Sequence, residues 1–307
     1  MKPIVLITGA NGMLAKQLAK QLIEKYSVRF LTRKVTKSDE YLWDLNRKYI
    51  DPKSLEGVDH IIHLAGSSIA EKLWSENRKK VILSSRIDSS QLILDELKKH
   101  QITIKSFISA SATGYYGSIT SDTIFNEESP KGDDYLGDVC AQWEQKAHLF
   151  KSGKTAQRVA IVRIGVVLSA NNQVLSRMSQ PIKYGVGAAV GTGKQYMPWI
   201  HIEDLCGIFK FVLTNEELNE TFNAVAPANT TNTEITKQIA KRINRKIILP
   251  NIPKFVIKLL FGELSTIILE GSRVSPNKII RHGFNFKYNT LEEALNNIYS
   301  QQKLKQK

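Results

Sequence analysis

The sequence predicts an α/β fold, a doubly wound parallel sheet with a small mixed C-terminal lobe. Apolar runs long enough for buried strands alternate with segments of helical periodicity up to about residue 164. Such alternation produces parallel sheets, because each helix returns the chain across a face of the sheet. After about Leu168 the alternation loosens. In a sheet of this kind, ligands bind beyond the carboxyl ends of the strands.

The stretch Ile4–Ala15 is the most informative part of the sequence. An apolar run leads through a glycine turn directly into a segment of helical periodicity. Gly9 allows a sharp turn, and Gly12 lacks the Cβ that would keep a pyrophosphate away from the backbone. The following helix would present N–H groups and the positive end of its dipole to that pyrophosphate. Between a strand and a helix, this glycine pattern predicts a dinucleotide site.

The other elements follow from periodicity and from the turn residues between them. Further strands are expected at Val28–Thr32, His60–Leu64, Ser106–Ser109 and Val159–Ile164. A long helix ends near His100, with Leu83, Ile87, Leu94 and Leu97 on one face, and another helix is expected at Cys140–Phe150. Nearer the C-terminus, the glycine-rich Tyr184–Gly193 suggests a mobile loop, Met197–Leu205 enters a helix, and helices are expected near Thr233–Ile243, Lys254–Leu260 and Leu291–Tyr299.

Composition favours an ordered chain in a reducing compartment. The 307 residues are 42% hydrophobic, which is enough for a packed core in one large domain or one domain with an appendage. No run of about eighteen apolar residues and no secretory signal is visible, so neither a membrane span nor secretion is expected. Cys140 and Cys206 have no metal-like spacing, so a reduced, cytoplasmic chain is the simpler interpretation.

The positive charge is concentrated near the C-terminus. The net charge is +14, and residues 227–307 hold 14 Lys or Arg against 5 Asp or Glu, which gives +9. A basic surface attracts nucleic acid or acidic lipid. These lysines are scattered along expected helices without interleaved aromatic residues, so a solvated face is the favoured interpretation. We therefore expect neither nucleic acid nor a membrane as a partner.

The end of the second expected strand indicates which dinucleotide fits. Sites for NAD place an acidic residue there, which binds the ribose 2′-hydroxyl. Here the sequence reads Leu31-Thr32-Arg33-Lys34, with no carboxylate before Asp39. A carboxylate would repel a 2′-phosphate, whereas Arg33 can pair with it and stack on adenine. The alternative is a solvated basic turn, but the position of Arg33 favours NADP(H).

Several motifs together resemble the extended short-chain dehydrogenases/reductases. They are Thr8–Gly12, His63–Gly66, Ser109–Gly117 and Arg163–Leu168. Trp74, Ser85-Arg86, Val139–Glu144, Gly193–His201 and Asn223–Pro227 narrow the resemblance to the atypical branch of epimerase family, nucleoside-diphosphate-sugar epimerase-like proteins. Leu260–Glu263, Gly271–Val274 and Gly283-Phe284 are similar to the short C-terminal domain of unknown function in that branch. The resemblance covers nearly the whole chain.

The resemblance implies a Rossmann-type domain at residues 1–168, with a returning strand and helix near 196–226, and mainly a substrate lobe at 169–307. The family-specific segment of that lobe would span residues 250–298. The resemblance implies NADP contacts at Thr32, Arg33, Leu64, Ala65, Gly66, Arg86 and Val166, beside the turn residues Gly9, Asn11, Gly12, Met13 and Leu14. A solvated arginine on a helix surface is an equally good interpretation of Arg86. A small-molecule substrate, with nucleotide sugars as candidates, and a monomer or homodimer are expected.

The resemblance also implies a chemistry that this sequence supports only in part. The family uses a Tyr-x-x-x-Lys pair, in which the lysine lowers the tyrosine pKa, and a Ser or Thr that binds the same substrate oxygen. Ser111 fits the serine position. In register, Leu136 replaces the tyrosine and Cys140 replaces the lysine. The usual proton-transfer pair is therefore missing.

Two functions remain open. In the first, an NADP(H)-dependent oxidoreductase or epimerase uses Ser111 with Tyr115 or Tyr116 for proton transfer, although adjacent tyrosines more often pack. In the second, the protein binds NADP(H) without turnover and acts as a sensor or scaffold. Cys140 and His201 are weaker candidates for proton transfer, because an inert thiol and a structural hydrogen bond are the more common roles.

The remaining candidates for chemistry are weak. His63, at the end of its expected strand, carries the same ambiguity as His201. No histidine spacing indicates a metal site. Ser111 lacks the Gly-x-Ser-x-Gly context of a hydrolase nucleophile, so acyl transfer is not expected.

Overall fold

The computed structural model describes residues 2–170 and 173–305. The chain forms two compact units that alternate along the sequence. The first unit holds the chain up to Tyr115, Asp138–Arg163 and Cys206–Phe222. The second unit holds Tyr116–Gly137, Ile164–Leu205 and the chain from Asn223 onward. Each unit has its own apolar core.

The first unit is built on a large sheet, and the predicted α/β class is confirmed. Its strands are β1 (Ile4–Thr8), β2 (Ser27–Thr32), β3 (Glu40–Asp44), β4 (Tyr49–Ile50), β5 (Val58–His63), β6 (Ile104–Ala112), β8 (Ala156–Ile164) and β11 (Thr221–Ala224). They lie in the order β11-β8-β6-β5-β1-β2-β3-β4. The pairs from β6 to β3 are parallel, and β4 runs antiparallel to β3. Periodicity did not predict the short strands β3 and β4.

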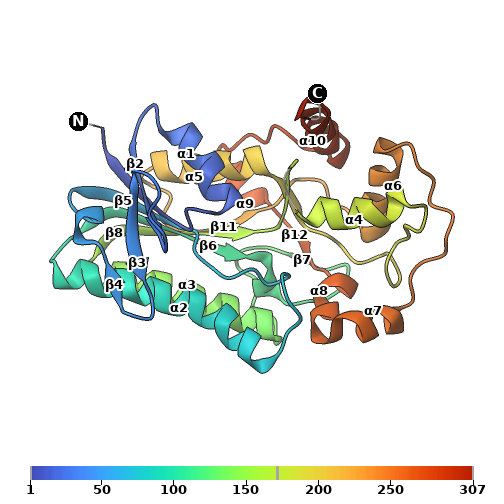
Figure 1. Ribbon diagram of the computed structural model, residues 1–307, viewed down its shortest axis with the longest axis horizontal. Coiled ribbons are helices and arrows are strands. Elements are labelled where there is room, and N and C mark those ends of the chain that lie inside the picture. Colours follow the sequence, from blue (N-terminus) through green and yellow to red (C-terminus); the bar gives the residue numbers. More distant parts are fainter. Residues whose placement is uncertain (1, 171–172, 306–307) are drawn as a thin grey trace. The chain divides into compact units, whose positions relative to one another are not determined.

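Helices cover both faces of this sheet. They are α1 (Met13–Leu22), α2 (Glu76–Lys99), α3 (Tyr135–Ser152) and α5 (Ile202–Thr214). Figure 1 shows α2 and α3 along one face and α1 and α5 along the other. Strand residues such as Leu6 and Phe107 are buried against Leu97 of α2 and Phe150 of α3. Phe107 and Phe150 stack with ring centroids 3.6 Å apart.

The strand order reverses at β1. The chain leaves β1 for β2 on one side and later returns to β5 on the other. At such a switch point the two connections run to opposite faces of the sheet, and ligands bind outside the carboxyl ends of the strands. β1 ends at Thr8 and β5 at His63, so the glycine turn and the segment after β5 both begin at this point.

The second unit mixes short strand pairs with helices. β9 (Val166–Leu168) pairs in parallel with β10 (Trp199–His201), and β7 (Ile124–Phe125) pairs with β12 (Arg273–Val274). Its helices are α4 (Gln173–Lys183), α6 (Asn232–Arg242), α7 (Lys254–Phe261), α8 (Thr266–Leu269), α9 (Asn277–Arg281) and α10 (Leu291–Lys305). Among the described residues the 3-10 turns are η1 (Pro52–Ser54), η2 (Thr113–Tyr116) and η3 (Gly262–Ser265), of which η3 lies in this unit. Trp199 packs with Ile235 of α6 and Leu295 of α10. Across the described residues, no helix is long and apolar enough to cross a membrane.

A buried arginine links β8 to the end of α5. Arg158 is 7% exposed, and its guanidinium donates to the carbonyls of Leu218 at 2.7 Å and of Val212 and Leu213 at 2.9 Å. The last carbonyls of a helix have no partner inside the helix and carry the negative end of its dipole. Arg158 therefore fixes the end of α5 against the sheet.

Arg158→Met should lower the free energy of unfolding by about 2–4 kcal/mol, because methionine keeps apolar contacts but leaves buried carbonyls without a charged donor. Urea denaturation followed by circular dichroism measures the loss. Arg47→Met is the matched control, since the Arg47 side chain is 85% exposed and the change should stay within about 0.5 kcal/mol. Equal unfolding midpoints for the two variants would contradict the role given to Arg158.

Candidate functional site

The glycine turn after β1 packs directly against the segment after β5. Gly9 has φ +75°, and a Cβ there would lie 3.1 Å from the carbonyl oxygen of Leu64. The Gly12 N–H donates to the Gly9 carbonyl at 2.8 Å, and a Cβ on Gly12 would come within 3.0 Å of that oxygen. Gly12 is the N-cap of the ten-residue helix α1, whose first turn holds no acidic residue. This turn has the features that a pyrophosphate needs: close backbone approach and a positive helix end.

The Thr8 hydroxyl joins the ends of β1 and β5. Its oxygen accepts the backbone N–H groups of Leu64 at 2.9 Å and Ala65 at 3.0 Å, and lies 3.0 Å from Nδ1 of His63. Because that oxygen already accepts two hydrogen bonds, its own O–H donates to Nδ1. Nε2 of His63 then carries the ring proton and donates to the Ser89 hydroxyl at 3.1 Å. The segment after β5 is therefore fixed by a chain of buried hydrogen bonds.

His63 is an uncharged part of this chain. It is fully buried, and burial, with a smaller contribution from the Arg86 guanidinium, lowers the pKa of His63 to about 3. Its ring also stacks on Phe107, with centroids 5.8 Å apart. These contacts favour a structural role for His63 over proton transfer.

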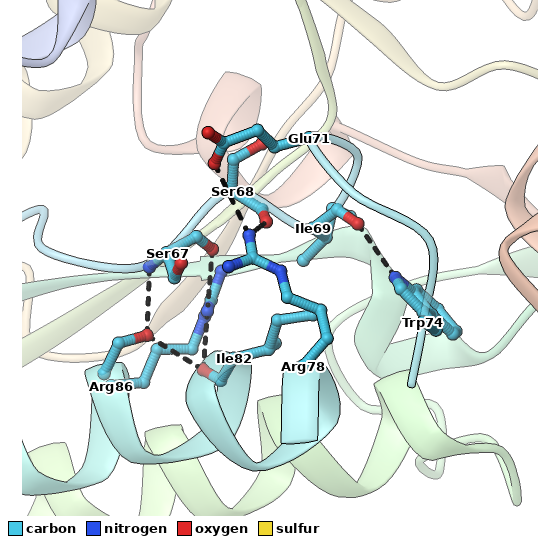
Figure 2. A network of polar contacts seen from close by, with 9 residues as sticks. Ser67, Ser68, Ile69, Glu71, Trp74, Arg78, Ile82 and Arg86 are labelled. Atoms are coloured by element: carbon cyan, nitrogen blue, oxygen red, sulfur yellow. Dashed lines mark hydrogen bonds and ion pairs between the residues drawn. The ribbon is translucent and has the colours of Figure 1, made fainter. Parts of the chain in front are cut away.

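The segment that follows Gly66 is held by α2 (Figure 2). Nη1 of Arg86 donates to the carbonyls of Ser67 at 3.2 Å and Ile82 at 2.7 Å, and Arg78 donates to the carbonyl of Ser68. The Ser67 N–H donates to the hydroxyl of Ser85 at 2.9 Å. A Cβ on Gly66 would lie 3.2 Å from the Arg86 guanidinium carbon. Arg86 is therefore half-buried under the predicted cofactor segment and is not a solvated helix-surface arginine.

The end of β2 presents exposed cations. Thr32 is buried, and its hydroxyl donates to the Lys34 carbonyl at 3.2 Å, while Arg33 and Lys34 are exposed. The next carboxylate with a defined contact is that of Glu40, which accepts the N–H and O–H of Thr36 at 2.7 and 2.8 Å. These hydrogen bonds from Thr36 lower the pKa of Glu40. The Glu40 carboxylate therefore binds Thr36 of its own loop, and Arg33 is exposed and available for an anion.

Ser111, one residue before the end of β6, lies beside a buried ion pair that the sequence did not predict. Its hydroxyl donates to Oε1 of Glu144 at 2.6 Å, and Arg163 donates to the same carboxylate through Nε and Nη2, both at 2.8 Å. The Arg163 guanidinium carbon lies 3.4 Å from the centroid of the Tyr115 ring. Glu144 and Arg163 are 6% and 3% exposed. The only sequence signal was their presence in the motifs Val139–Glu144 and Arg163–Leu168.

Tyr116 belongs to the second unit and is packed there. It is fully buried, its hydroxyl donates to Oδ1 of Asn223 at 2.7 Å, and its ring stacks on Phe125 at 5.4 Å. Val166 is also in this unit, and its N–H donates to the Pro198 carbonyl at 2.6 Å. All the other predicted cofactor residues belong to the first unit. They lie in the turn (Gly9, Asn11, Gly12, Met13, Leu14), at the end of β2 (Thr32, Arg33), after β5 (Leu64, Ala65, Gly66) and on α2 (Arg86).

The other proton-transfer candidates have structural contacts. Leu136 and Cys140 of α3 are 7% and 3% exposed, and burial raises the pKa of the Cys140 thiol to about 12. Burial lowers the pKa of His201 to about 4; its Nδ1 accepts the N–H of Glu203 at 3.2 Å, and its ring lies 3.9 Å from that of Tyr288. Among the described residues no group of histidine, cysteine and carboxylate side chains could hold a metal ion.

Comparison with known proteins gives the family. A model of the NAD dependent epimerase/dehydratase family matches residues 5–225, and a model of a domain of unknown function, DUF1731, matches residues 252–298. The chain belongs to the NAD dependent epimerase/dehydratase family. The resemblance inferred from the motifs is thereby confirmed, including its C-terminal part.

Individual relatives match over most of this chain. The epimerase family protein SDR39U1 homolog, chloroplastic, from Arabidopsis thaliana is 34% identical over 96% of this chain and 86% of its own length. The crystal structure of human epimerase family protein SDR39U1 with NADPH has a TM-score of 0.86 and 28% identity, and covers 97% of this chain and 99% of that one. A nucleoside-diphosphate sugar epimerase from Corynebacterium glutamicum has a TM-score of 0.78 and 28% identity. It matches 99% of this chain, which spans only 61% of that protein.

The neutral histidines predict a stability that falls in mild acid. Burial holds the pKa of His63 at about 3 and that of His60 and His201 at about 4, whereas an unfolded histidine has a pKa near 6.5. Since the unfolded chain then binds more protons, stability is full above about pH 6.5 and is lost as the pH falls. Each histidine contributes up to about 1.4 kcal/mol per pH unit below its unfolded pKa.

We expect His63→Asn to reduce the slope of unfolding free energy against pH between about pH 6.5 and 5, because asparagine does not titrate. Urea denaturation at a series of pH values measures that slope. Asparagine can keep one of the ring's hydrogen bonds, so the variant should remain folded at neutral pH. An unchanged slope would show that His63 is not neutral in the folded protein.

Proposed function

We propose that this chain binds NADP(H) at the switch point between β1 and β5 and acts as an epimerase-like oxidoreductase. The main support for the proposal is the packing of Gly9 against Leu64. This contact brings together the glycine turn, the N-terminus of α1 and the segment after β5. The exposed Arg33 at the end of β2 supports NADP over NAD. The NADPH in the human relative's structure supports the same cofactor.

Named residues would hold each part of the cofactor. The backbone of Asn11 to Leu14 would bind the pyrophosphate, and Thr32 and Arg33 the adenosine 2′-phosphate. Leu64–Gly66, which Arg86 supports, would line one side of the bound cofactor. Val166 remains a proposed contact from the second unit. When bound, the cofactor supplies the hydride acceptor or donor that these residues lack.

Ser111 and Tyr115 are the residues we propose for handling the substrate proton. Because the Ser111 hydroxyl donates to Glu144, its oxygen can accept a hydrogen bond from a substrate hydroxyl. Tyr115, whose ring lies on the Arg163 guanidinium, has a fixed cation next to it in place of the absent lysine. Tyr116 stays a weaker candidate, since its hydroxyl donates to Asn223. Nucleotide sugars are the proposed substrate class, supported by the name of the Corynebacterium glutamicum neighbour.

A second function is an NADP(H) sensor without turnover. The observation that favours it is the replacement of the usual pair by Leu136 and Cys140, whose buried thiol has a pKa raised to about 12. Such a thiol stays protonated near neutral pH and is a poor proton acceptor. In either function we propose a cytoplasmic monomer or homodimer. The Arabidopsis relative is named chloroplastic, so the compartment is open to test.

Arg33→Asp should remove a preference for NADPH over NADH. A charge-assisted bond to the 2′-phosphate is worth about 1.5–3 kcal/mol, which corresponds to roughly a tenfold or greater preference in the parent protein. Calorimetric titration with both cofactors measures it. Arg47→Asp, an exposed arginine in the β3–β4 turn, is the control and should keep the preference.

A second variant distinguishes a loss of preference for NADPH over NADH from a loss of the whole dinucleotide site. Gly12→Val places a branched side chain where the backbone must approach the pyrophosphate, so both cofactors should lose affinity. Because a Cβ there lies 3.0 Å from the Gly9 carbonyl oxygen, we expect a lower thermal midpoint but the parent's circular dichroism. Equal affinity of the parent protein for NADPH and NADH would refute the role of Arg33. Unchanged binding in folded Gly12→Val would place the cofactor elsewhere.

Turnover distinguishes the two functions. The protein is loaded either with NADP+, which can accept a hydride, or with NADPH, which can donate one. With each form, a panel of nucleotide sugars is tested for epimerised product and for a change in NADPH absorbance. If a substrate is found, Ser111→Ala and Tyr115→Phe should each lower kcat at least about tenfold, with NADPH affinity nearly unchanged. Ser109→Ala, a buried serine two residues earlier in β6, is the control. NADPH binding with no turnover across the panel would favour the sensor.

A further inference from the structure

Large apolar side chains are exposed along one stretch of the second unit. Phe255, Leu259 and Leu260 of α7 are 71%, 84% and 60% exposed. Ile248 and Leu249, in the connection before α7, are 82% and 45% exposed. Single exposed apolar residues are ordinary, whereas adjacent ones mark an interaction site, and Phe255 and Leu259 are one helical turn apart on α7. We name these five residues the α7 apolar surface.

The helix geometry places apolar and cationic side chains together. α7 packs against η3 and α8, and Ile257 is its buried residue. Residues four apart lie on the same helix face, so Phe255 and Leu259 stand one turn apart on the exposed side. Lys254 and Lys258 flank them on the same exposed arc. Lysine stems can cover apolar surface while their ammonium groups reach outward.

The charge of this stretch has a single sign. Residues 235–262 contain seven Lys or Arg and no Asp or Glu. Three of these cations, Lys241, Arg242 and Lys254, pair with carboxylates elsewhere in the unit. Arg245, Lys246 and Lys258 are exposed, and within residues 2–170 and 173–305 they form no ion pair. A partner for this stretch therefore has to be both apolar and anionic.

This combination selects among partners. A second copy of the chain would bring two cationic faces together, and like charges oppose such a contact. Nucleic acid offers phosphates but no apolar cover for four aliphatic side chains, and Phe255 is the one aromatic side chain of the surface available for base stacking. An anionic membrane supplies both requirements, since a shallow apolar insertion and cation pairing with headgroups reinforce each other.

We propose that the α7 apolar surface attaches the protein to an anionic lipid membrane. Phe255 and Leu259 enter the boundary between headgroups and acyl chains, and Arg245, Lys246 and Lys258 face the lipid phosphates. The attachment is peripheral. The proposal replaces the expectation from sequence that no membrane is a partner, because the sequence could not show that these large apolar residues are exposed. It does not depend on the cofactor proposal.

Sedimentation of the full chain with vesicles tests the attachment. We expect binding to phosphatidylcholine vesicles with about 30% phosphatidylglycerol, several-fold weaker binding to phosphatidylcholine alone, and loss of binding between about 100 and about 500 mM salt. Phe255→Gln/Leu259→Gln keeps helix propensity and should lower partitioning at least about tenfold. Lys246→Gln/Lys258→Gln should lower it several-fold on anionic vesicles only.

The matched control is Ile23→Gln/Leu149→Gln, which makes the same change at positions of the first unit that are 64% and 36% exposed. This variant should bind vesicles as the parent does, and all variants should keep the parent's circular dichroism and thermal midpoint. Absence of sedimentation, or parental binding by Phe255→Gln/Leu259→Gln, would overturn the proposal. The proposal would also be overturned if the parent did not bind vesicles but formed a dimer or an RNA complex that Phe255→Gln/Leu259→Gln abolishes. That result would identify the other partner.

Discussion

The hydroxyl of Thr8 is the contact on which the candidate site depends. It uses both acceptor positions on the N–H groups of Leu64 and Ala65 and its proton on His63, so no hydrogen-bonding capacity is left over. That link holds the carboxyl ends of β1 and β5 in the separation at which Gly9 just clears the Leu64 carbonyl. It works because His63 stays neutral. A protonated ring would place a second N–H against the Thr8 hydroxyl, which could then no longer donate its proton to Nδ1.

A second constraint is the buried pair of Glu144 and Arg163. Two buried charges are stabilising only when geometry and further hydrogen bonds offset their lost hydration. Here both carboxylate oxygens accept from Arg163, Ser111 adds a third bond, and the Tyr115 ring covers the guanidinium. The pair joins α3 to β8 at the end of β6. The cation that contacts the Tyr115 ring therefore comes from β8, and it is already paired with a carboxylate from α3.

The sequence predicts the frame of the molecule better than its chemistry. Apolar periodicity locates the principal strands and helices, because a buried strand or helix must repeat apolar residues in sequence. The glycine turn is equally visible, since Gly9 requires a positive φ. The sequence does not predict strands β3 and β4, because they are short and their buried residues do not alternate regularly. The sequence does not predict Glu144 as the partner of Ser111 for another reason. The two residues are far apart in sequence, and only tertiary packing brings them together.

The two adjacent tyrosines illustrate that limit. In sequence, Tyr115 and Tyr116 are interchangeable candidates, because a turn can point either phenol toward a ligand. In the structure they belong to different units, Tyr115 with Arg163 and Tyr116 with Asn223. Tyr116 is fully buried and its hydroxyl donates to a fixed amide oxygen, so deleting that hydroxyl removes a buried hydrogen bond, a stability effect of about 1 kcal/mol. Tyr115 is only half-buried and lies on a cation. These contacts are why we propose Tyr115, and not Tyr116, for proton transfer.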